Sequence, residues 1–259
     1  MSAVDFHARL PPAAGARDDL LRVMDDLGIG RAAVSAGGLV DLDRLSELVG
    51  AGAGRSAHRG GRSAVRPVAD NDFVLRNTHR SGGRLLPFFF ADPATDVAAY
   101  AAEAPSYRGL EISPAVHGVR LDDPGVRALV ATAEAARHPV YVVCLGRPGT
   151  RAADLVTLAR AFPAVDFVFG HCGFTGLDVR GLATIAPQPN IVAETSGCFT
   201  AVARLALHRL GPDRVLFGTE YPLQHPRVEL AKLAALDLAP AVLRKVTSEN
   251  ALRLLGEET

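Results

Sequence analysis

The segment Val4-Asp5-Phe6-His7-Ala8-Arg9 carries the main architectural signal of this chain, because an apolar run gives way there to polar residues. Seven further short runs rich in Val, Ile, Leu and Phe follow, most of them separated by stretches with helical periodicity. Strands that alternate with helices form a parallel sheet, and eight of them predict an α/β fold, a single-domain (β/α)8 TIM barrel over residues 1–259. The predicted strands are Val4–Arg9, Arg31–Ser35, Leu85–Ala91, Gly109–Ser113, Val140–Leu145, Asp166–His171, Ile191–Thr195 and Val215–Thr219.

Reactive or ionisable side chains stand near the ends of several predicted strands. They are His7, Arg9, Cys144, His171 and Glu220. In a closed parallel barrel the carboxyl ends of the strands converge on one face, so residues far apart in the chain can share one pocket. The sequence therefore predicts a single polar site at the C-terminal mouth of the barrel.

Composition limits the classes of function. Lys and Arg together number 28, as do Asp and Glu, and no basic stripe stands out, so we predict no nucleic-acid partner. No apolar run approaches about 18 residues, which predicts a cytoplasmic protein with no membrane partner. Cys144, Cys172 and Cys198 form no CxxC pair and are expected as reduced thiols lining the pocket. The only lysines, Lys232 and Lys245, fall in predicted helices away from strand ends, which leaves little room for Schiff-base chemistry.

Six segments, read in order, resemble the amidohydrolase superfamily, in particular the branch of metal-dependent hydrolases and decarboxylases related to aminocarboxymuconate semialdehyde decarboxylase. The matching segments span nearly the whole chain: Val4-Asp5-Phe6-His7-Ala8-Arg9, Phe90-Ala91-Asp92-Pro93, Gly109-Leu110-Glu111-Ile112, Phe169-Gly170-His171-Cys172-Gly173, Phe217-Gly218-Thr219-Glu220-Tyr221-Pro222 and Asn250-Ala251. The resemblance implies a (β/α)8 barrel that binds metal through Asp-x-His-x-His on the first strand, a His on each of the fifth and sixth strands, and an Asp on the eighth.

This sequence departs from that ligand pattern at three positions. Arg9 stands at the second histidine of the first strand, Cys144 at the strand-five histidine and Glu220 at the strand-eight aspartate. Only His7 and His171 keep the residue type that the resemblance implies. We therefore expect an altered or absent metal site.

Two interpretations of this degenerate ligand set compete. In one, His7, Cys144, His171 and Glu220 bind a zinc ion, since a thiolate, two imidazoles and a carboxylate make a reasonable tetrahedral set. In the other, the Arg9 guanidinium takes the place of the ion and pairs with Glu220. A fixed cation close to His7 disfavours a second one, so no cofactor is the preferred expectation and zinc is the alternative.

Other residues are candidates for catalysis or binding. Glu111 alternates with Leu110 and Ile112; if it faces the barrel centre, it is either a general acid or base beside His171 or a structural partner of Arg9. Tyr221 and His225 follow the eighth strand, where substrate contacts gather in barrel enzymes.

Some of these candidates have an equally simple structural interpretation. Cys144 is either a nucleophile and substrate contact or a small apolar filler, and Ser196 is a weak candidate nucleophile. His79, His138 and His208 fall near predicted helix ends and are expected at the surface.

The resemblance implies hydrolysis or decarboxylation of a small polar or carboxylate-bearing substrate, by a chain that relatives suggest is a homodimer. Arg9 is expected to anchor the substrate anion, His7 and His171 to handle protons or an ion, and Glu220 and Glu111 to orient them. One alternative is an inactive pseudoenzyme that serves as a binding subunit, since a fold does not guarantee activity. Another is a metal-independent lyase, cyclase or isomerase of a specialised pathway.

A segment rich in Gly, Arg, Ser and Ala interrupts the pattern at about residues 50–66. It is predicted as a mobile surface loop, and it has two interpretations. It is either solvated or a lid that brings a basic residue to an anionic substrate, the candidates being Arg55, His58, Arg59 and Arg62.

Overall fold

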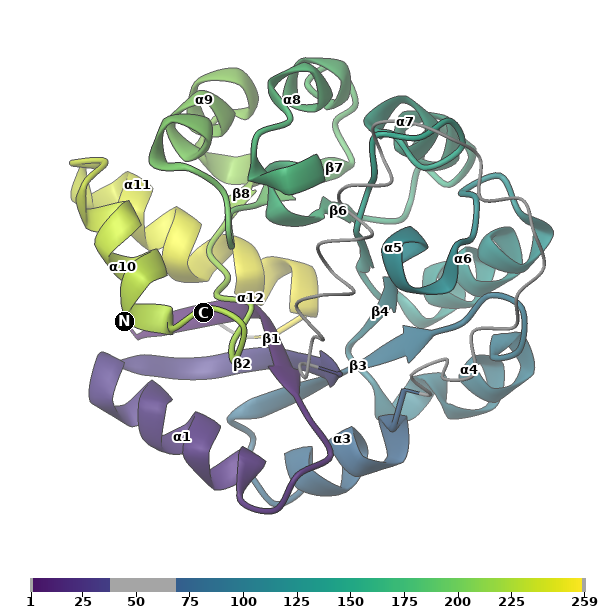
Figure 1. Ribbon diagram of the computed structural model, residues 1–259, viewed down its shortest axis with the longest axis horizontal. Coiled ribbons are helices and arrows are strands. Elements are labelled where there is room, and N and C mark those ends of the chain that lie inside the picture. The colour runs from purple at the N-terminus through teal and green to yellow at the C-terminus, as the bar shows by residue number, and fades with distance from the viewer. Residues whose placement is uncertain (1, 38–68, 258–259) are drawn as a thin grey trace.

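The computed structural model describes residues 2–37 and 69–257 of the chain. Eight parallel strands lie in chain order, each hydrogen-bonded to the next, with helices around them (Figure 1). The predicted (β/α)8 barrel is confirmed. The predicted loop at residues 50–66, with Arg55, His58, Arg59 and Arg62, lies outside the described residues. The strands are β1 Ala3–Leu10, β2 Ile29–Ala36, β3 Leu85–Ala91, β4 Gly109–Ile112, β5 Val140–Val142, β6 Phe167–Phe169, β7 Ile191–Glu194 and β8 Val215–Leu216.

The later strands end earlier than the sequence predicted. β5 ends at Val142 rather than Leu145, and β8 ends at Leu216 rather than Thr219. Cys144 and Phe217, which follow these ends, are still buried, whereas Val143 and Leu145 are half-buried. The backbone leaves the ladder there to form the mouth of the barrel, so hydrophobicity predicted longer strands than the hydrogen bonds define.

Backbone hydrogen bonds join the first and last strands. The amide of Phe6 donates to the carbonyl of Phe217 over 3.0 Å, and the amide of Glu220 donates to the carbonyl of His7 over 2.7 Å. The buried Asp5 carboxylate adds a bond from the amide of Thr219 at 3.0 Å. This seam brings His7 and Glu220 next to each other and nearly closes the barrel.

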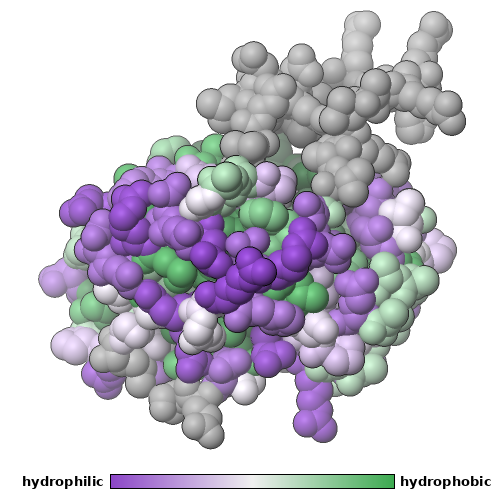
Figure 2. Space-filling model, turned by 90° about the horizontal axis from the view of Figure 1, so that it is seen from below, coloured by the Kyte–Doolittle hydropathy of each residue, from purple (hydrophilic) through white to green (hydrophobic). Residues whose placement is uncertain are grey.

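The helices surround the barrel, and the residues before and after them explain their ends. Asp123, before the Pro124 that begins α6, accepts a hydrogen bond from the amide of Gly125 at 2.7 Å, which caps that helix. The face in Figure 2 is mostly hydrophilic, with smaller apolar areas between. The helices are α1 Ala16–Leu27, α3 Asn71–Thr78, α4 Val97–Glu103, α5 Pro114–His117, α6 Pro124–Ala136, α7 Ala152–Ala161, α8 Val179–Ile185, α9 Thr200–Leu210, α10 Pro226–Ala234, α11 Pro240–Arg244 and α12 Asn250–Leu255, with a π-helical turn at Lys245–Glu249.

The buried apolar residues form two clusters. The larger one packs mainly the outer side of the strands against the surrounding helices and also includes Phe90, Cys172 and Cys198. The other fills the barrel, where Phe6 and Phe88 meet edge to face at 5.6 Å, and it includes the apolar residues of α12. Asn250 of α12 donates to the carbonyl of Val215 at 2.9 Å, at the start of β8 and thus at the end opposite the mouth. Within residues 2–37 and 69–257, no helix is long and apolar enough to cross a membrane.

An irregularity in β1 turns its last polar residues into the barrel. The register with β2 shifts between Asp5 and Ala8. Phe6 belongs to the cluster inside the barrel, whereas Ala8 belongs to the outer cluster although it lies two residues further on. Because a bulge re-aims the side chains after it, His7 and Arg9 face inward.

Candidate active site

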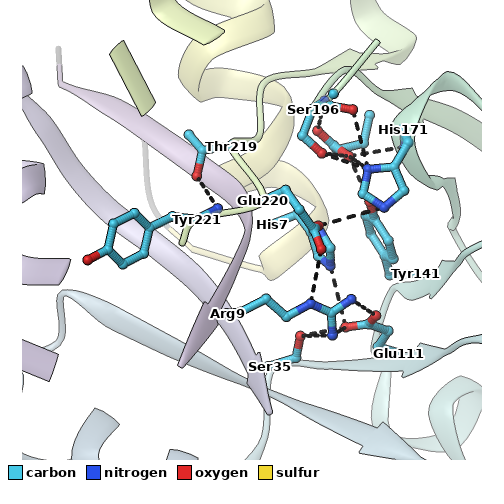
Figure 3. A network of polar contacts seen from close by, with 12 residues as sticks. His7, Arg9, Ser35, Glu111, Tyr141, His171, Ser196, Thr219, Glu220 and Tyr221 are labelled. Carbon is cyan, nitrogen blue, oxygen red and sulfur yellow. Dashed lines mark hydrogen bonds and ion pairs between the residues drawn. The ribbon is translucent and has the colours of Figure 1, made fainter. Parts of the chain in front are cut away.

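Polar side chains that lie in seven of the strands, or in the loops directly after them, meet at the mouth of the barrel, and Figure 3 shows how most of them point toward one another. They share an inward orientation near the carboxyl ends of their strands, where catalytic residues of this fold lie. Most are buried or nearly so, so each polar atom needs a partner. The set is His7, Arg9, Ser35, Glu111, Tyr141, His171, Glu194, Ser196 and Glu220.

Arg9 and Glu111 form a bidentate ion pair at the centre of this set. Arg9 Nη2 lies 2.6 Å from Glu111 Oε1, and Nη1 lies 3.1 Å from Oε2. Nη1 also donates to the hydroxyl of Ser35 at 3.3 Å and the carbonyl of Ala36 at 3.2 Å, and the guanidinium covers the ring of Phe90 at 5.1 Å. Burial raises the pKa of Glu111, but the charges of Arg9 and His7 and the hydrogen bonds from His7 and Ser35 together outweigh it and lower the pKa to about 2.

His7 lies between two carboxylates. Its Nδ1 contacts Glu220 Oε2, and its Nε2 lies 3.5 Å from Glu111 Oε2. The ring stacks on Tyr141 with centroids 4.0 Å apart and planes 9° from parallel. Burial disfavours the charged ring, but Glu220 and Glu111 outweigh this effect and raise the pKa of His7 to about 10.

Glu220 uses its two carboxylate oxygens differently. Oε1 accepts from Arg9 Nε at 3.3 Å, while Oε2 faces His7 and lies 3.7 Å from His171 Nε2. Burial acts to raise the pKa of this carboxyl, and the charges of His7, Arg9 and His171 instead hold it well below its usual range. Its backbone has a φ of 56°, in the left-handed region that is uncommon for non-glycine residues and recurs at functional sites.

The surroundings of His171 select one tautomer of its ring. Nδ1 lies 2.9 Å from the hydroxyl and 3.3 Å from the carbonyl of Ser196. A carbonyl can only accept, so Nδ1 is the protonated nitrogen and donates to Ser196. In the neutral ring, Nε2 therefore carries the lone pair, and it faces Glu220 and the hydroxyl of Tyr141, which is 3.5 Å away.

Glu194 at the end of β7 organises the residues around His171. One of its oxygens, Oε2, accepts from the hydroxyls of Tyr141 at 2.7 Å and Ser196 at 2.8 Å and from the amide of His171 at 3.2 Å. The other contacts the amide of Ser196. Glu194 thus fixes both the stacking partner of His7 and the hydrogen-bond partner of His171.

The residues present fit a divalent metal ion. Among the described residues, His7, His171 and Glu220 form a group whose candidate ligand atoms all lie within 4.8 Å of one another. Both ring nitrogens of His7 and Oε2 of Glu220 are buried yet make no hydrogen bond of acceptable geometry. Two imidazoles and a carboxylate are a donor set that suits zinc with an open coordination position.

The family assignment rests on nearly the whole chain. Residues 4–256 match the family model described as amidohydrolase. This chain belongs to the amidohydrolase family. The resemblance drawn from the sequence is confirmed, and a comparison with curated proteins found no match.

Solved structures of other amidohydrolase-like barrels share the fold of this family member. 2,6-Dihydroxybenzoate decarboxylase from Rhizobium has a TM-score of 0.66 at 18% identity, over 99% of both chains. 5-Carboxyvanillate decarboxylase from Novosphingobium aromaticivorans, solved with manganese and a nitrobenzoic acid, has a TM-score of 0.68 at 15% identity, over 98% of this chain and 96% of that one. An amidohydrolase from Burkholderia multivorans with bound zinc has a TM-score of 0.70 at 16% identity, over 100% of both.

Cys144 of this amidohydrolase lies away from the group of ligand atoms. It belongs to the outer apolar cluster, whereas Tyr141 stacks on His7 inside the barrel and Val143 packs on the inner cluster. Val143 is therefore the residue on the inner side at the end of strand five. Burial raises the pKa of the Cys144 thiol, which disfavours the thiolate that a metal ligand or nucleophile needs.

Arg9, Tyr221 and His225 are placed differently from their expected roles as substrate contacts. The nitrogens of Arg9 bond to protein groups, so this side chain positions Glu111 and Glu220 rather than offering a free anchor. The ring of Tyr221 points away from the polar network (Figure 3). His225 is an exposed cap of α10 that accepts from the amide of Arg227 at 3.2 Å.

The structure corrects two predictions of where a residue lies. His138 was expected at the surface, but it is buried, and its Nδ1 lies 2.7 Å from the hydroxyl of Tyr100. Lys232 was expected away from strand ends, but its Nζ donates to the carbonyl of Thr195, the residue after β7, at 2.6 Å. His79 and His208 are exposed as predicted.

All three thiols are buried, and all three belong to the same apolar cluster. Cys172 lies beside Cys198, near the loop after β7. That all three line the pocket stays a prediction, although the alternation of Cys144 with Val143, which packs on the inner cluster, places Cys144 on the outer side of its strand.

Sequence reasoning missed Ser35, Tyr141 and Glu194 as members of the network. Glu194 was visible in principle, because a carboxylate within an apolar strand must find a partner. Tyr141 and Ser35 gave no such signal, since a tyrosine or a serine in a strand is unremarkable.

Proposed function

We propose that this chain is a carboxy-lyase or hydrolase of small carboxylate-bearing molecules, and that His7, His171 and Glu220 hold one divalent cation at the mouth of the barrel. The observation that carries the proposal is the convergence of ligand atoms from β1, the loop after β6 and the loop after β8, all within 4.8 Å of one another. Those of His7 and Glu220 are in addition buried without a hydrogen bond of acceptable geometry. A fold alone would not carry it, because one fold hosts many activities.

The chain's own residues prepare the three ligand atoms. Ser196 keeps the proton of His171 on Nδ1, which leaves Nε2 free to bind. Arg9 takes Oε1 of Glu220 and leaves Oε2 for the cation. Bound there, a divalent cation would polarise a substrate carbonyl or carboxylate, or lower the pKa of a water molecule.

The proposed substrates are small aromatic or other planar carboxylic acids. The solved neighbours named above include two decarboxylases, of 5-carboxyvanillate and of 2,6-dihydroxybenzoate. In this chain the rings of Phe90 and Tyr141 flank Arg9 and His7, which is consistent with a flat ligand at the mouth. The substrate carboxylate would meet the cation, since the Arg9 nitrogens bond within the protein.

One observation favours a second candidate, a metal-free binding subunit. His7 and Arg9, if both are charged, balance the carboxylates of Glu111 and Glu220, so these four side chains reach neutrality without an ion. In that case the chain binds a ligand without turning it over, or it catalyses a metal-independent lyase or isomerase reaction.

Metal analysis of the full chain, purified without chelator, tests the proposal. We expect close to one zinc or manganese ion per chain, and a loss of most of it in His7→Asn and Glu220→Gln variants. His225→Asn is the matched control, because that histidine is an exposed helix cap and its variant should keep the wild-type metal content. Release of CO2 from a panel of aromatic carboxylic acids is then measured with and without chelator.

Two results would contradict the proposal. A folded wild-type chain without metal that gains an ion only in an Arg9→His variant would favour the metal-free binding subunit. Turnover that a chelator leaves unchanged would favour metal-independent chemistry.

A further inference from the structure

We infer that Glu229 and Lys232 of α10 are positioning residues for His171. Their buried ion pair clamps the loop after β7, and through Ser196 that loop holds the His171 ring in one tautomer and one orientation. The inference rests on the proposed function only in taking His171 as part of the reaction centre.

This clamp, the ion pair of Glu229 and Lys232, hydrogen-bonds to the backbone of the loop on both sides of Ser196. Lys232 Nζ donates to the carbonyl of Thr195 at 2.6 Å and to that of Cys198 at 3.0 Å. The carboxylate of Glu229 accepts from the amide of Gly197 at 3.0 Å. Glu229 and Lys232 also contact each other, one turn apart on the helix, with 2% and 8% of their surfaces exposed.

The gripped loop presents two Ser196 atoms to one nitrogen of His171. The hydroxyl and the carbonyl of Ser196 lie 2.9 Å and 3.3 Å from Nδ1. A shift of the loop would move both, and Nδ1 would lose the acceptors that keep its proton in place. The effect on His171 is therefore indirect and travels along the backbone of Thr195–Cys198.

A purely stabilising role accounts poorly for charges at this position. A buried ion pair loses much of its Coulombic gain to desolvation, and apolar residues of similar volume often replace one at little cost. Apolar residues could not, however, bond to two carbonyls and an amide of the same loop. The pair thus sets the position of the loop, whatever it also contributes to the stability of the fold.

The test uses the full chain with Glu229→Gln, with Lys232→Met, and with both substitutions together. Nitrogen-15 NMR of the imidazole reports the tautomer of His171, whose signals are assigned by their absence in His171→Gln. We expect one tautomer in the wild type and a mixture in each variant, with kcat lower by about 10- to 100-fold and KM little changed.

The matched controls make the same kinds of substitution, Lys→Met and Glu→Gln, in two ion pairs at the surface. Lys245→Met removes the chain's other lysine, which pairs with Asp213 in a partly exposed contact. Glu249→Gln removes a carboxylate that pairs with Arg244 in another. Both controls should keep the wild-type tautomer and kcat.

The double variant decides the matter if a single one does not fold, because it leaves no unpaired buried charge. A folded double variant with the wild-type His171 tautomer would overturn the inference and leave the proposed function standing. Conversely, a tautomer change in a chain that neither binds metal nor turns over substrate would support the clamp and count against the proposed function.

Discussion

Replacing Arg9 with methionine should strongly destabilise the fold, because it leaves the buried carboxylate of Glu111 without its ion-pair partner. That carboxylate is fully buried, and the substitution removes its bonds of 2.6 and 3.1 Å to the guanidinium, leaving the hydroxyl of Ser35 and the ring of His7 beside it. Removing one partner of a buried ion pair costs about 3–5 kcal/mol. At about 2–4 °C per kcal/mol for a domain of this size, the midpoint of thermal unfolding should fall by roughly 10 °C.

Urea unfolding followed by circular dichroism measures this loss in a double-mutant cycle. Arg9→Met and Glu111→Leu are each expected to be destabilising, and the double variant should recover most of the loss, since no charge is then buried alone. Arg120→Met is the control, because Arg120 and Asp122 are both exposed and solvent screening leaves their pair little effect on stability. The reasoning would be refuted if the effects of Arg9→Met and Glu111→Leu on the free energy of unfolding were additive. It would also be refuted if Arg9→Met lost no more stability than the control variant.

Two further variants test other parts of the structure. Burial lowers the pKa of His138 to about 4, below the 6.5 of an unfolded chain, so unfolding takes up a proton between these values and stability falls as the pH drops through that window. After allowance for solvent screening, His138→Phe should remove about 1–2 kcal/mol of the loss between pH 7 and pH 4, whereas His79→Phe should not; equal pH slopes in all three proteins would contradict this. In Gly170→Ala the new methyl group would lie 2.6 Å from the ring of Tyr141, so the ring must move and metal affinity should fall by about tenfold or more. Gly146→Ala, with its nearest neighbour at 3.5 Å, should bind metal normally, and an equal affinity in the two variants would argue against a role for the Tyr141 ring.

The fold could be predicted from the sequence because its signals are local. Apolar periodicity shows where strands and helices lie, and capping residues and prolines show where helices begin and end. Sequence reasoning failed where the phase of a strand decides the outcome. The run from Val140 to Val143 is apolar at every position, so alternation gives no phase, and only pairing with β4 and β6 turns Val143 inward and Cys144 outward. In β1 the bulge reverses which side chains point inward and which point outward, and the residue types do not predict this reversal.

The members of the candidate site were predictable to different degrees. His7, His171 and Glu220 were found because each lies in a strand that reaches the mouth or in the loop directly after one, and the structure brings their ligand atoms together. Lys232 was missed because a long side chain on a helix is usually solvated, and its partners are backbone carbonyls that carry no sequence signal.

The hydrogen-bonded seam between β1 and the segment after β8 determines when the reaction centre can form during synthesis and folding. Glu220, whose amide bonds to the His7 carbonyl, is synthesised only after the seven strands that follow β1. Contacts of such long sequence separation form late, after the entropy of a very large loop has been lost. A nascent or truncated chain that ends before Glu220 therefore cannot assemble the centre, and binding competence arises only after β8 and Glu220 have been made.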